Sequence, residues 1–259
     1  MTRIDLFDDI ELDFSAERVG ISCDHPQVPE DQSNLAVKAA LAFFEAAGNR
    51  LKAHGLFIRI TKRIPPGGGL GGGSSNAATV LMALNAYHHQ HFSDSELRQI
   101  GLGLGADVPF FIGGVPAIAR GVGEQLTPVD HLVPYYLVLC DPGISASTAE
   151  VYKNIDFQLT ENQKYTMNTG LNVPIRGQMF DVWGQLHNDL EEPACRLYPG
   201  IKKTKEEMAF LLDRNVHMTG SGSSLFALYP DREKAKAGVD RLVAEWSGSG
   251  KQVFLSSFI

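Results

Sequence analysis

The stretch Pro65-Pro-Gly-Gly-Gly-Leu-Gly-Gly-Gly-Ser-Ser75 carries the densest local signal in the sequence. It follows an alternating apolar run at 56–64, which predicts a strand, and precedes residues 76–88, whose apolar spacing predicts a helix. Its six glycines remove every Cβ that would keep the backbone away from a ligand. The N–H groups and the positive dipole end of a helix start attract anions. This order of strand, glycine loop and helix therefore indicates a phosphate site, with a flexible turn as the alternative.

Two better-known glycine motifs fit this stretch poorly. The GxxxxGK[ST] loop needs a Lys after the second glycine cluster, and the sequence has none there. Gly67-x-Gly69-x-x-Gly72 satisfies the dinucleotide fingerprint literally, but that fingerprint requires a βαβ unit. Here a second predicted helix, at 94–104, follows the first. The pattern therefore disfavours a dinucleotide fold.

A second glycine turn, Thr219-Gly-Ser-Gly-Ser-Ser224, stands between two predicted strands. An ordinary tight turn in a sheet is the alternative interpretation. If both glycine segments border one cleft, the first would hold nucleotide phosphates and the second would lie close to the transferred phosphate.

Asp107 is the acid of greatest interest. It stands in Gly105-Ala-Asp-Val-Pro109, next to the apolar residues 110–112. A carboxylate there is suited to accept a proton from a hydroxyl that attacks a γ-phosphate. A helix N-cap or turn residue is the alternative role. His88, His89 and His91 cluster at a helix end, where the dipole explains them better than a metal does, so we assign no metal-ligating residue.

Composition limits the classes of protein that remain. The 259 residues are 44% hydrophobic and 20% charged, as in a globular protein of two modest domains. The net charge of −7, without a basic block, argues against nucleic acid as a partner. No run approaches the roughly 20 apolar residues of a membrane span, and the acidic start is no targeting signal. We expect a cytoplasmic protein with a small-molecule substrate and no membrane partner; the oligomeric state is not readable.

The remaining pattern predicts an α+β fold in two domains, 1–133 and 134–259. Residues 3–23 predict a β meander, and 134–140 a buried strand. Residues 160–178 read as loop. The other expected elements are helices at 34–47, 182–190 and 201–213, a strand-turn-helix at 217–241 and a last strand at 251–258.

The two glycine segments together resemble the second and third motifs of the GHMP kinases, the superfamily of galactose, homoserine, mevalonate and phosphomevalonate kinases. Three further segments are similar to one branch, whose members phosphorylate the 2-hydroxyl of a cytidine diphosphate derivative of methylerythritol in non-mevalonate isoprenoid synthesis. These segments are Gly105-Ala-Asp-Val-Pro-Phe-Phe-Ile112, Asn188-Asp-Leu-Glu-Glu-Pro193 and Gly143-Ile-Ser-Ala-Ser-Thr-Ala-Glu-Val-Tyr152. The resemblance runs from about residue 4 to the end.

The resemblance implies a ribosomal-S5-like N-terminal domain that binds ATP and a ferredoxin-like C-terminal domain. It implies ATP and Mg²⁺ as cofactors and Asp107 as the catalytic aspartate. Tyr152 matches an aromatic under the cytosine, and Thr148 a further substrate contact. The implied ATP-binding residues are Pro65, Pro66, Gly67, Gly68, Gly69, Leu70, Gly71, Gly72, Gly73, Ser74 and Ser75, and the implied substrate-binding residues are Thr148, Tyr152, Gly220, Ser221, Gly222 and Ser223.

The sequence departs from the family at its start. The family begins with Pro-Ala-Lys-Ile-Asn-Leu, whose Lys lies beside the catalytic aspartate, and continues to Gly-Tyr-His, which recognises cytosine. Neither motif is present. Arg3-Ile-Asp-Leu-Phe7 mimics the first, but residues 4–12 fit better the strand after Gly-Tyr-His. On this comparison about 30 N-terminal residues of the family are absent, and the chain as it stands is expected to be a poor catalyst.

Three functions remain open from the residues. The first is a kinase of the branch named above. The second is a non-catalytic nucleotide-binding relative, which would bind ATP without substrate-dependent ADP release. The third is another GHMP kinase such as a homoserine kinase, against which residues 105–112 and 188–193 argue.

Overall fold

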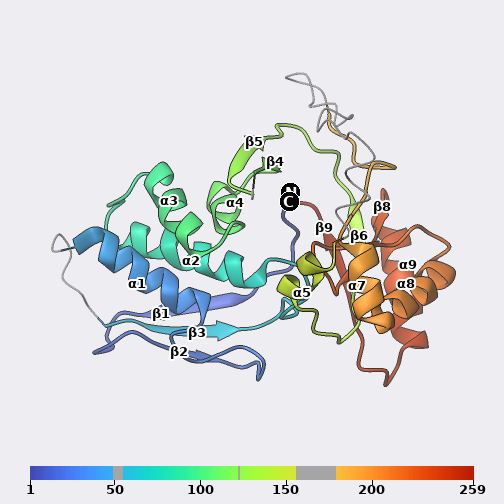
Figure 1. The fold of residues 1–259 in the computed structure, drawn as a ribbon, viewed down its shortest axis with the longest axis horizontal. Helices are drawn as coiled ribbons and strands as arrows, with labels where there is room; N and C mark the ends of the chain where they lie inside the picture. Colours follow the sequence, from blue (N-terminus) through green and yellow to red (C-terminus); the bar gives the residue numbers. More distant parts are fainter. Residues whose placement is uncertain (49–54, 122, 156–178) are drawn as a thin grey trace. The chain divides into compact units, whose positions relative to one another are not determined.

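A computed structural model describes residues 1–48, 55–121, 123–155 and 179–259. These residues form two compact units (Figure 1). Unit 1 comprises Met1–Pro66 and Gly71–Val129, and unit 2 comprises Gly67–Leu70 and Asp130–Ile259. The domains 1–133 and 134–259 stay a prediction.

Unit 1 contains a three-stranded sheet of β1 (Asp9–Asp13), β2 (Gly20–Cys23) and β3 (Phe57–Thr61). Its order is β1-β3-β2, with β3 antiparallel to β1 and parallel to β2. The expected meander is therefore wrong, because β1 and β2 both pair with β3 instead of with each other. Alternation along a strand tells which side chains are buried but not which strand is the neighbour. The parallel pairing of β2 with β3 requires a crossover, and α1 (Leu35–Ala47) provides it.

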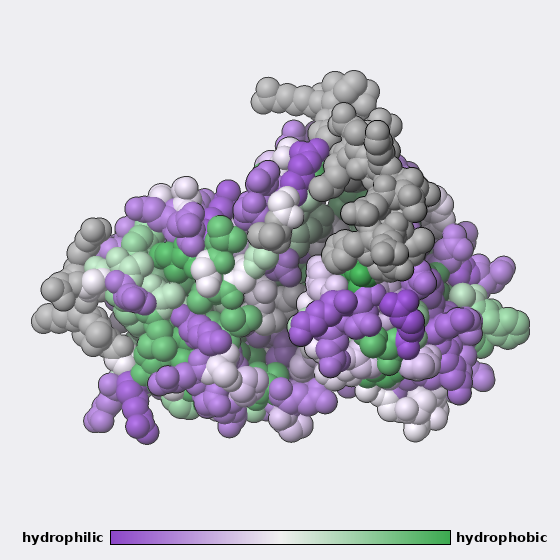
Figure 2. All heavy atoms as spheres, in the orientation of Figure 1, coloured by the Kyte–Doolittle hydropathy of each residue, from purple (hydrophilic) through white to green (hydrophobic). Residues whose placement is uncertain are grey.

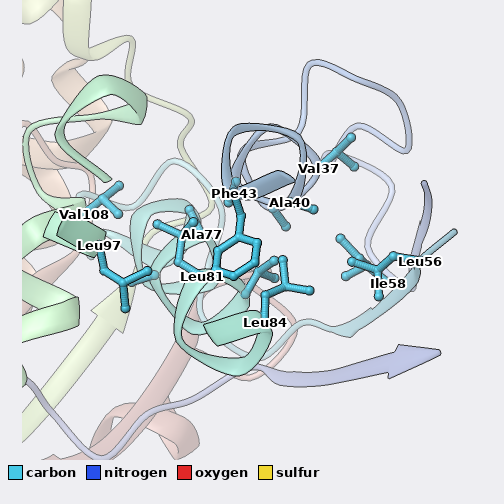
Figure 3. Packing of buried hydrophobic residues seen from close by; sticks show 14 of the residues in the cluster. Val37, Ala40, Phe43, Leu56, Ile58, Ala77, Leu81, Leu84, Leu97 and Val108 are labelled. Carbon is cyan, nitrogen blue, oxygen red and sulfur yellow. The ribbon is translucent and has the colours of Figure 1, made fainter. Parts of the chain in front are cut away.

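Within the described part of unit 1, four helices and a hairpin accompany the sheet. The helices α1 and α2 (Gly72–Tyr87) cover one face of the sheet (Figure 1). Phe43 of α1 is fully buried and points toward Leu81 and Leu84 of α2 (Figure 3). Burying such a side chain stabilises the fold by about 1.5–3 kcal/mol. The remaining elements are α3 (Asp94–Leu104), α4 (Val108–Gly113) and the antiparallel strands β4 (Ala117–Arg120) and β5 (Gln125–Pro128).

Unit 2 is built on a four-stranded antiparallel sheet in the order β7-β8-β6-β9. Side chains of the central strands, such as Val138 and Ala227, are fully buried with Met208 and Leu242 of two helices. The α+β class expected from the sequence is confirmed. The strands are β6 (Tyr136–Asp141), β7 (His217–Met218), β8 (Leu225–Tyr229) and β9 (Gln252–Ser257), and the helices are α5 (Thr148–Lys153), α7 (Glu191–Leu197), α8 (Pro199–Leu212) and α9 (Arg232–Glu245).

The helix expected at 182–190 is wrong. This segment forms turns, and α7 begins only at Glu191. Asp181 accepts the Trp183 N–H at 2.8 Å, and Asn188 accepts the Leu190 N–H at 3.0 Å. Such local side-chain bonds offer the backbone an alternative to the helix. The loop expected at 160–178 lies outside the described residues.

The surface mixes polar and apolar side chains. Figure 2 shows hydrophilic residues over both units on the face in view, with apolar residues exposed between them. None of the helices in the described ranges is long and apolar enough to cross a membrane. Across the same ranges, no three His, Cys, Asp or Glu side chains come together as a metal site.

Candidate active site

The first glycine segment runs directly into α2, which begins at Gly72, four residues before the expected start. Gly71 occupies the N-cap position in the left-handed conformation, with φ +67°, and no side chain caps the helix. The first turn contains no acidic residue. The first N–H groups of a helix have no acceptor within it, so this end of α2 presents uncapped donors and a positive dipole. Both features suit a phosphate group.

A glycine is required at position 71 for two reasons. L-residues with a side chain rarely adopt its positive φ. In addition, a Cβ there would lie 3.0 Å from two ring atoms of Phe111. The conformation of the loop before α2 therefore depends on this glycine.

Asp107 occupies the N-cap position of α4 without a side-chain capping bond. The residue has helical φ and ψ. It is exposed at the surface, yet burial by the surrounding protein atoms raises the pKa of its carboxyl. Asp107 thus occupies the N-cap position and a turn, as the alternative role expects, but its carboxylate makes no capping bond. This carboxylate, with its raised pKa, is therefore available for proton transfer.

The segment that carries Asp107 packs beside the first turn of α2. A Cβ at Gly105 would lie 4.0 Å from Oγ of Ser74, whose residue is the third of that helix. Unit 1 thus brings the predicted acid, the Ser74 hydroxyl and the uncapped N–H groups into one region.

Lys62 is a cation near this region that the sequence prediction missed. It forms an ion pair with Asp8, and the two side chains are only 5% and 1% exposed. The Asp8 carboxylate also accepts the N–H groups of Arg63 and Ile64, at 2.8 and 2.9 Å. A Cβ at Gly72 would lie 3.2 Å from Lys62 Nζ, so the ammonium is next to the start of α2. The missed signal was the alternation of β3, which places position 62 on the same face as the buried Ile58 and Ile60.

The second glycine segment is packed into unit 2. Ser221 and Ser223 are buried, and the Ser223 hydroxyl donates to the Ile144 carbonyl. The Ser221 hydroxyl is 2.8 Å from Oγ1 of Thr148 at the start of α5, so two predicted substrate residues are in contact. Tyr152 lies four residues farther along α5, on the same side of the helix. Its side chain is 54% exposed.

Asn188 is a second residue whose role the sequence prediction missed. Its amide nitrogen donates to the carbonyls of Met218 and Gly220, at 3.0 and 2.8 Å. Glu191 accepts the Met218 N–H at 3.2 Å and pairs with Lys205. The segment at 188–193, which served only for the resemblance, thus anchors the entry to the second glycine segment. The signal was present as a motif, but its function could not be read without the contacts.

The predicted site residues fall into two groups. Asp107, Pro65, Pro66 and the residues 71–75 belong to unit 1, while Gly67–Leu70, Thr148, Tyr152 and the second glycine segment belong to unit 2.

Comparisons with known proteins define the class. Residues 34–115 match the family "GHMP kinases N terminal domain", and residues 178–248 match "GHMP kinases C terminal". The chain belongs to the GHMP kinases and is an ATP-dependent kinase of small molecules. The expected two-domain GHMP kinase fold is thereby confirmed.

Individual relatives narrow this class. The 4-diphosphocytidyl-2-C-methyl-D-erythritol kinase of Syntrophotalea carbinolica is 41% identical over 244 residues, which cover 93% of this chain and 84% of the relative. The enzyme of that name from Geobacter sp. strain M21 is 39% identical over 238 residues, covering 91% and 81%. Within the GHMP kinases, the chain therefore groups with the 4-diphosphocytidyl-2-C-methyl-D-erythritol kinases.

Solved structures agree with this placement. A crystal structure of 4-(cytidine 5'-diphospho)-2C-methyl-D-erythritol kinase is 34% identical, with a TM-score of 0.74 over 98% of this chain and 87% of that one. The homoserine kinase of Cytophaga hutchinsonii has the same TM-score over 97% and 85% of the chains but only 18% identity, which shows the fold alone. The comparisons therefore favour a kinase of the 4-diphosphocytidyl-2-C-methyl-D-erythritol branch over a homoserine kinase or a non-catalytic relative.

Proposed function

We propose that the chain transfers the γ-phosphoryl group of ATP to the 2-hydroxyl of 4-diphosphocytidyl-2-C-methyl-D-erythritol, a step of non-mevalonate isoprenoid precursor synthesis in the cytoplasm. The similarity to kinases of that name over nine tenths of the chain supports the substrate. The observation that carries the chemistry is the packing of the Asp107 segment beside the uncapped first turn of α2.

In the proposed reaction, the segment at 65–75 binds the ATP phosphates. The N–H groups at the start of α2 neutralise charge on the phosphates. Lys62 lies next to them, paired with Asp8. The substrate oxygen forms a bond to the γ-phosphorus while the bond to the β,γ-bridging oxygen breaks and ADP leaves. Asp107 orients the hydroxyl and accepts its proton.

Mg²⁺ is proposed as the cation that accompanies ATP. It is held in such sites by one or two protein oxygens together with phosphate oxygens. No carboxylate cluster in the described ranges forms an all-protein cage, which fits an ion that arrives with the nucleotide. The hydroxyls of Ser74 and Ser75, in the first turn of α2, are the protein oxygens that would hold it. When bound, the ion withdraws charge from the phosphates.

On the substrate side, we propose that the exposed ring of Tyr152 stacks under the cytosine. Thr148 and residues 220–223 would contact the rest of the substrate. The hydrogen bond between Thr148 and Ser221 supports a shared role, because it fixes two hydroxyls within one small region.

The test is ADP release measured by a coupled assay with a panel of alcohols. We expect release with 4-diphosphocytidyl-2-C-methyl-D-erythritol and none above background with homoserine or mevalonate. Activity with homoserine alone would contradict the substrate assignment. ATP binding without release for any alcohol would favour a non-catalytic relative.

A further inference from the structure

The two glycine segments are hydrogen-bonded to each other through a single carbonyl. The Gly68 oxygen accepts the Thr219 hydroxyl at 2.9 Å and the Ser224 N–H at 3.1 Å. Gly68 lies in the segment proposed for ATP, and Thr219 immediately precedes the segment proposed for the substrate. All these residues belong to unit 2, so the contact is internal to one compact unit.

The backbones of the two segments lie in close contact. A Cβ at Gly69 would lie 2.4 Å from the Thr219 carbonyl oxygen and 2.8 Å from that of Gly222. A Cβ at Gly220 would lie 3.2 Å from the Gly69 carbonyl oxygen. A displacement of residues 68–69 therefore presses directly on residues 219–222.

The second segment passes such a displacement to the substrate residues. Beyond Thr219, Ser221 is hydrogen-bonded to Thr148 at the start of α5. At its entry, Asn188 holds the carbonyls of Met218 and Gly220. A chain of contacts thus leads from Gly68 through Thr219 to Thr148.

From this chain of contacts we propose that Thr219 is a positioning residue that couples ATP binding to substrate binding. ATP fixes the conformation of the segment around Gly68. Through its hydrogen bond to the Gly68 carbonyl, Thr219 then fixes the conformation of residues 220–223. The substrate side is therefore prearranged when ATP is bound. Such coupling is reciprocal: ATP tightens the binding of the alcohol by the same factor as the alcohol tightens the binding of ATP. The inference rests on the proposed function.

The test compares the wild type with Thr219→Val, which keeps the shape of the side chain but removes the hydroxyl. The dissociation constants of a non-hydrolysable ATP analogue and of the alcohol are measured by calorimetry, each alone and each with the other saturating. For the wild type we expect each ligand to tighten the other about fivefold or more. Loss of the hydroxyl should bring this factor close to one, because the coupling contact is removed. The dissociation constants of the single ligands should change less.

Two further variants separate coupling from folding. Thr219→Ser restores the hydroxyl and should restore the coupling, which a purely structural loss would not explain. Thr127→Val, on the exposed strand β5 of unit 1, is the matched control and should behave as the wild type. If Thr219→Val does not fold, Thr219→Ala replaces it against the same serine variant.

The proposal is overturned if the wild type shows no coupling, or if Thr219→Val retains it. The alcohol used is the one that supports ADP release in the panel, so a wrong substrate assignment still leaves the coupling measurable. A chain that turns over its alcohol without coupling would contradict this inference while leaving the proposed reaction intact.

Discussion

The two glycine segments look alike in sequence, Gly-Gly-Gly-Ser-Ser at 71–75 and Gly-Ser-Gly-Ser-Ser at 220–224, yet they differ in what they leave free. The first opens a helix of 16 residues without any capping side chain. The second joins two strands, and its buried Ser223 hydroxyl is bonded to the Ile144 carbonyl. The first segment therefore offers the donors of a helix start to a ligand, while the second uses the Ser223 hydroxyl to hold its own position within unit 2. Composition alone does not distinguish these two arrangements.

The largest effect is expected beside the first segment. Asp107→Asn should lower kcat by on the order of a hundredfold or more, the scale of a lost acid-base group, and should leave ATP binding in place. Steady-state kinetics and calorimetry with an ATP analogue measure the two quantities. Near-normal turnover would remove Asp107 from the chemistry and would leave the first segment without an acid partner.

The same carboxyl predicts how activity depends on pH. Burial raises the pKa of Asp107 above the ordinary value of 3.8, and the proton acceptor is the ionised form. Activity should therefore be present above this raised pKa and fall about tenfold per pH unit below it. The pH profile of kcat/KM checks this, and an acid limb centred at or below the ordinary aspartate value would contradict it.

A substitution that strains the backbone of the first segment should have the next largest effect. Gly71→Ala introduces a side chain at φ +67° and next to the Phe111 ring, so it should strain the start of α2 by about 1–2 kcal/mol and raise KM for ATP roughly tenfold. Gly103→Ala is the matched control, because its φ is ordinary and a Cβ there meets no atom within 4 Å. Equal KM values for the two variants would argue against a phosphate role for the first segment.

The smallest effect is expected on the free energy of unfolding, which should change for a serine of the second segment but not for one of the first. Ser223→Ala leaves the partly buried Ile144 carbonyl without its donor and should lower the free energy of unfolding by about 1 kcal/mol. Ser74→Ala should hardly change stability but raise KM for ATP a few-fold. Chemical denaturation measures the first quantity, with Ser95→Ala on the exposed side of α3 as the control. The opposite pattern would reverse the roles that we give to the two segments.

Much of this arrangement was predictable, because strong local patterns decide it. The helix after the first glycine segment and the strands around the second follow from periodicity and punctuation. The position of β3 between β1 and β2 was not predictable. The alternation of apolar residues shows which side chains are buried, but it does not show which strands pair. The predicted helix at 182–190 failed because Asp181 and Asn188 bind backbone N–H groups locally.

The site was predictable to a similar degree. The glycines and serines of the first segment predicted a phosphate site. The motif around Asp107 predicted a carboxylate that takes part in the reaction. Lys62 was missed because it lies in a strand read only for its apolar residues, and its partner Asp8 is distant in sequence. Asn188 acts through backbone carbonyls, which any residue supplies, so no sequence pattern could have shown its partners.

The strand order β1-β3-β2 also bears on how the chain folds during its synthesis. The central strand β3 is made last, so β1 and β2 have no partner until residue 61 has left the ribosome. The ladders that form then join distant parts of the chain, which slows folding. During this interval the apolar faces of β1 and β2 are open to other chains, which makes nascent chains prone to associate. The strand that leads into the proposed ATP segment is thus also the one that completes the sheet.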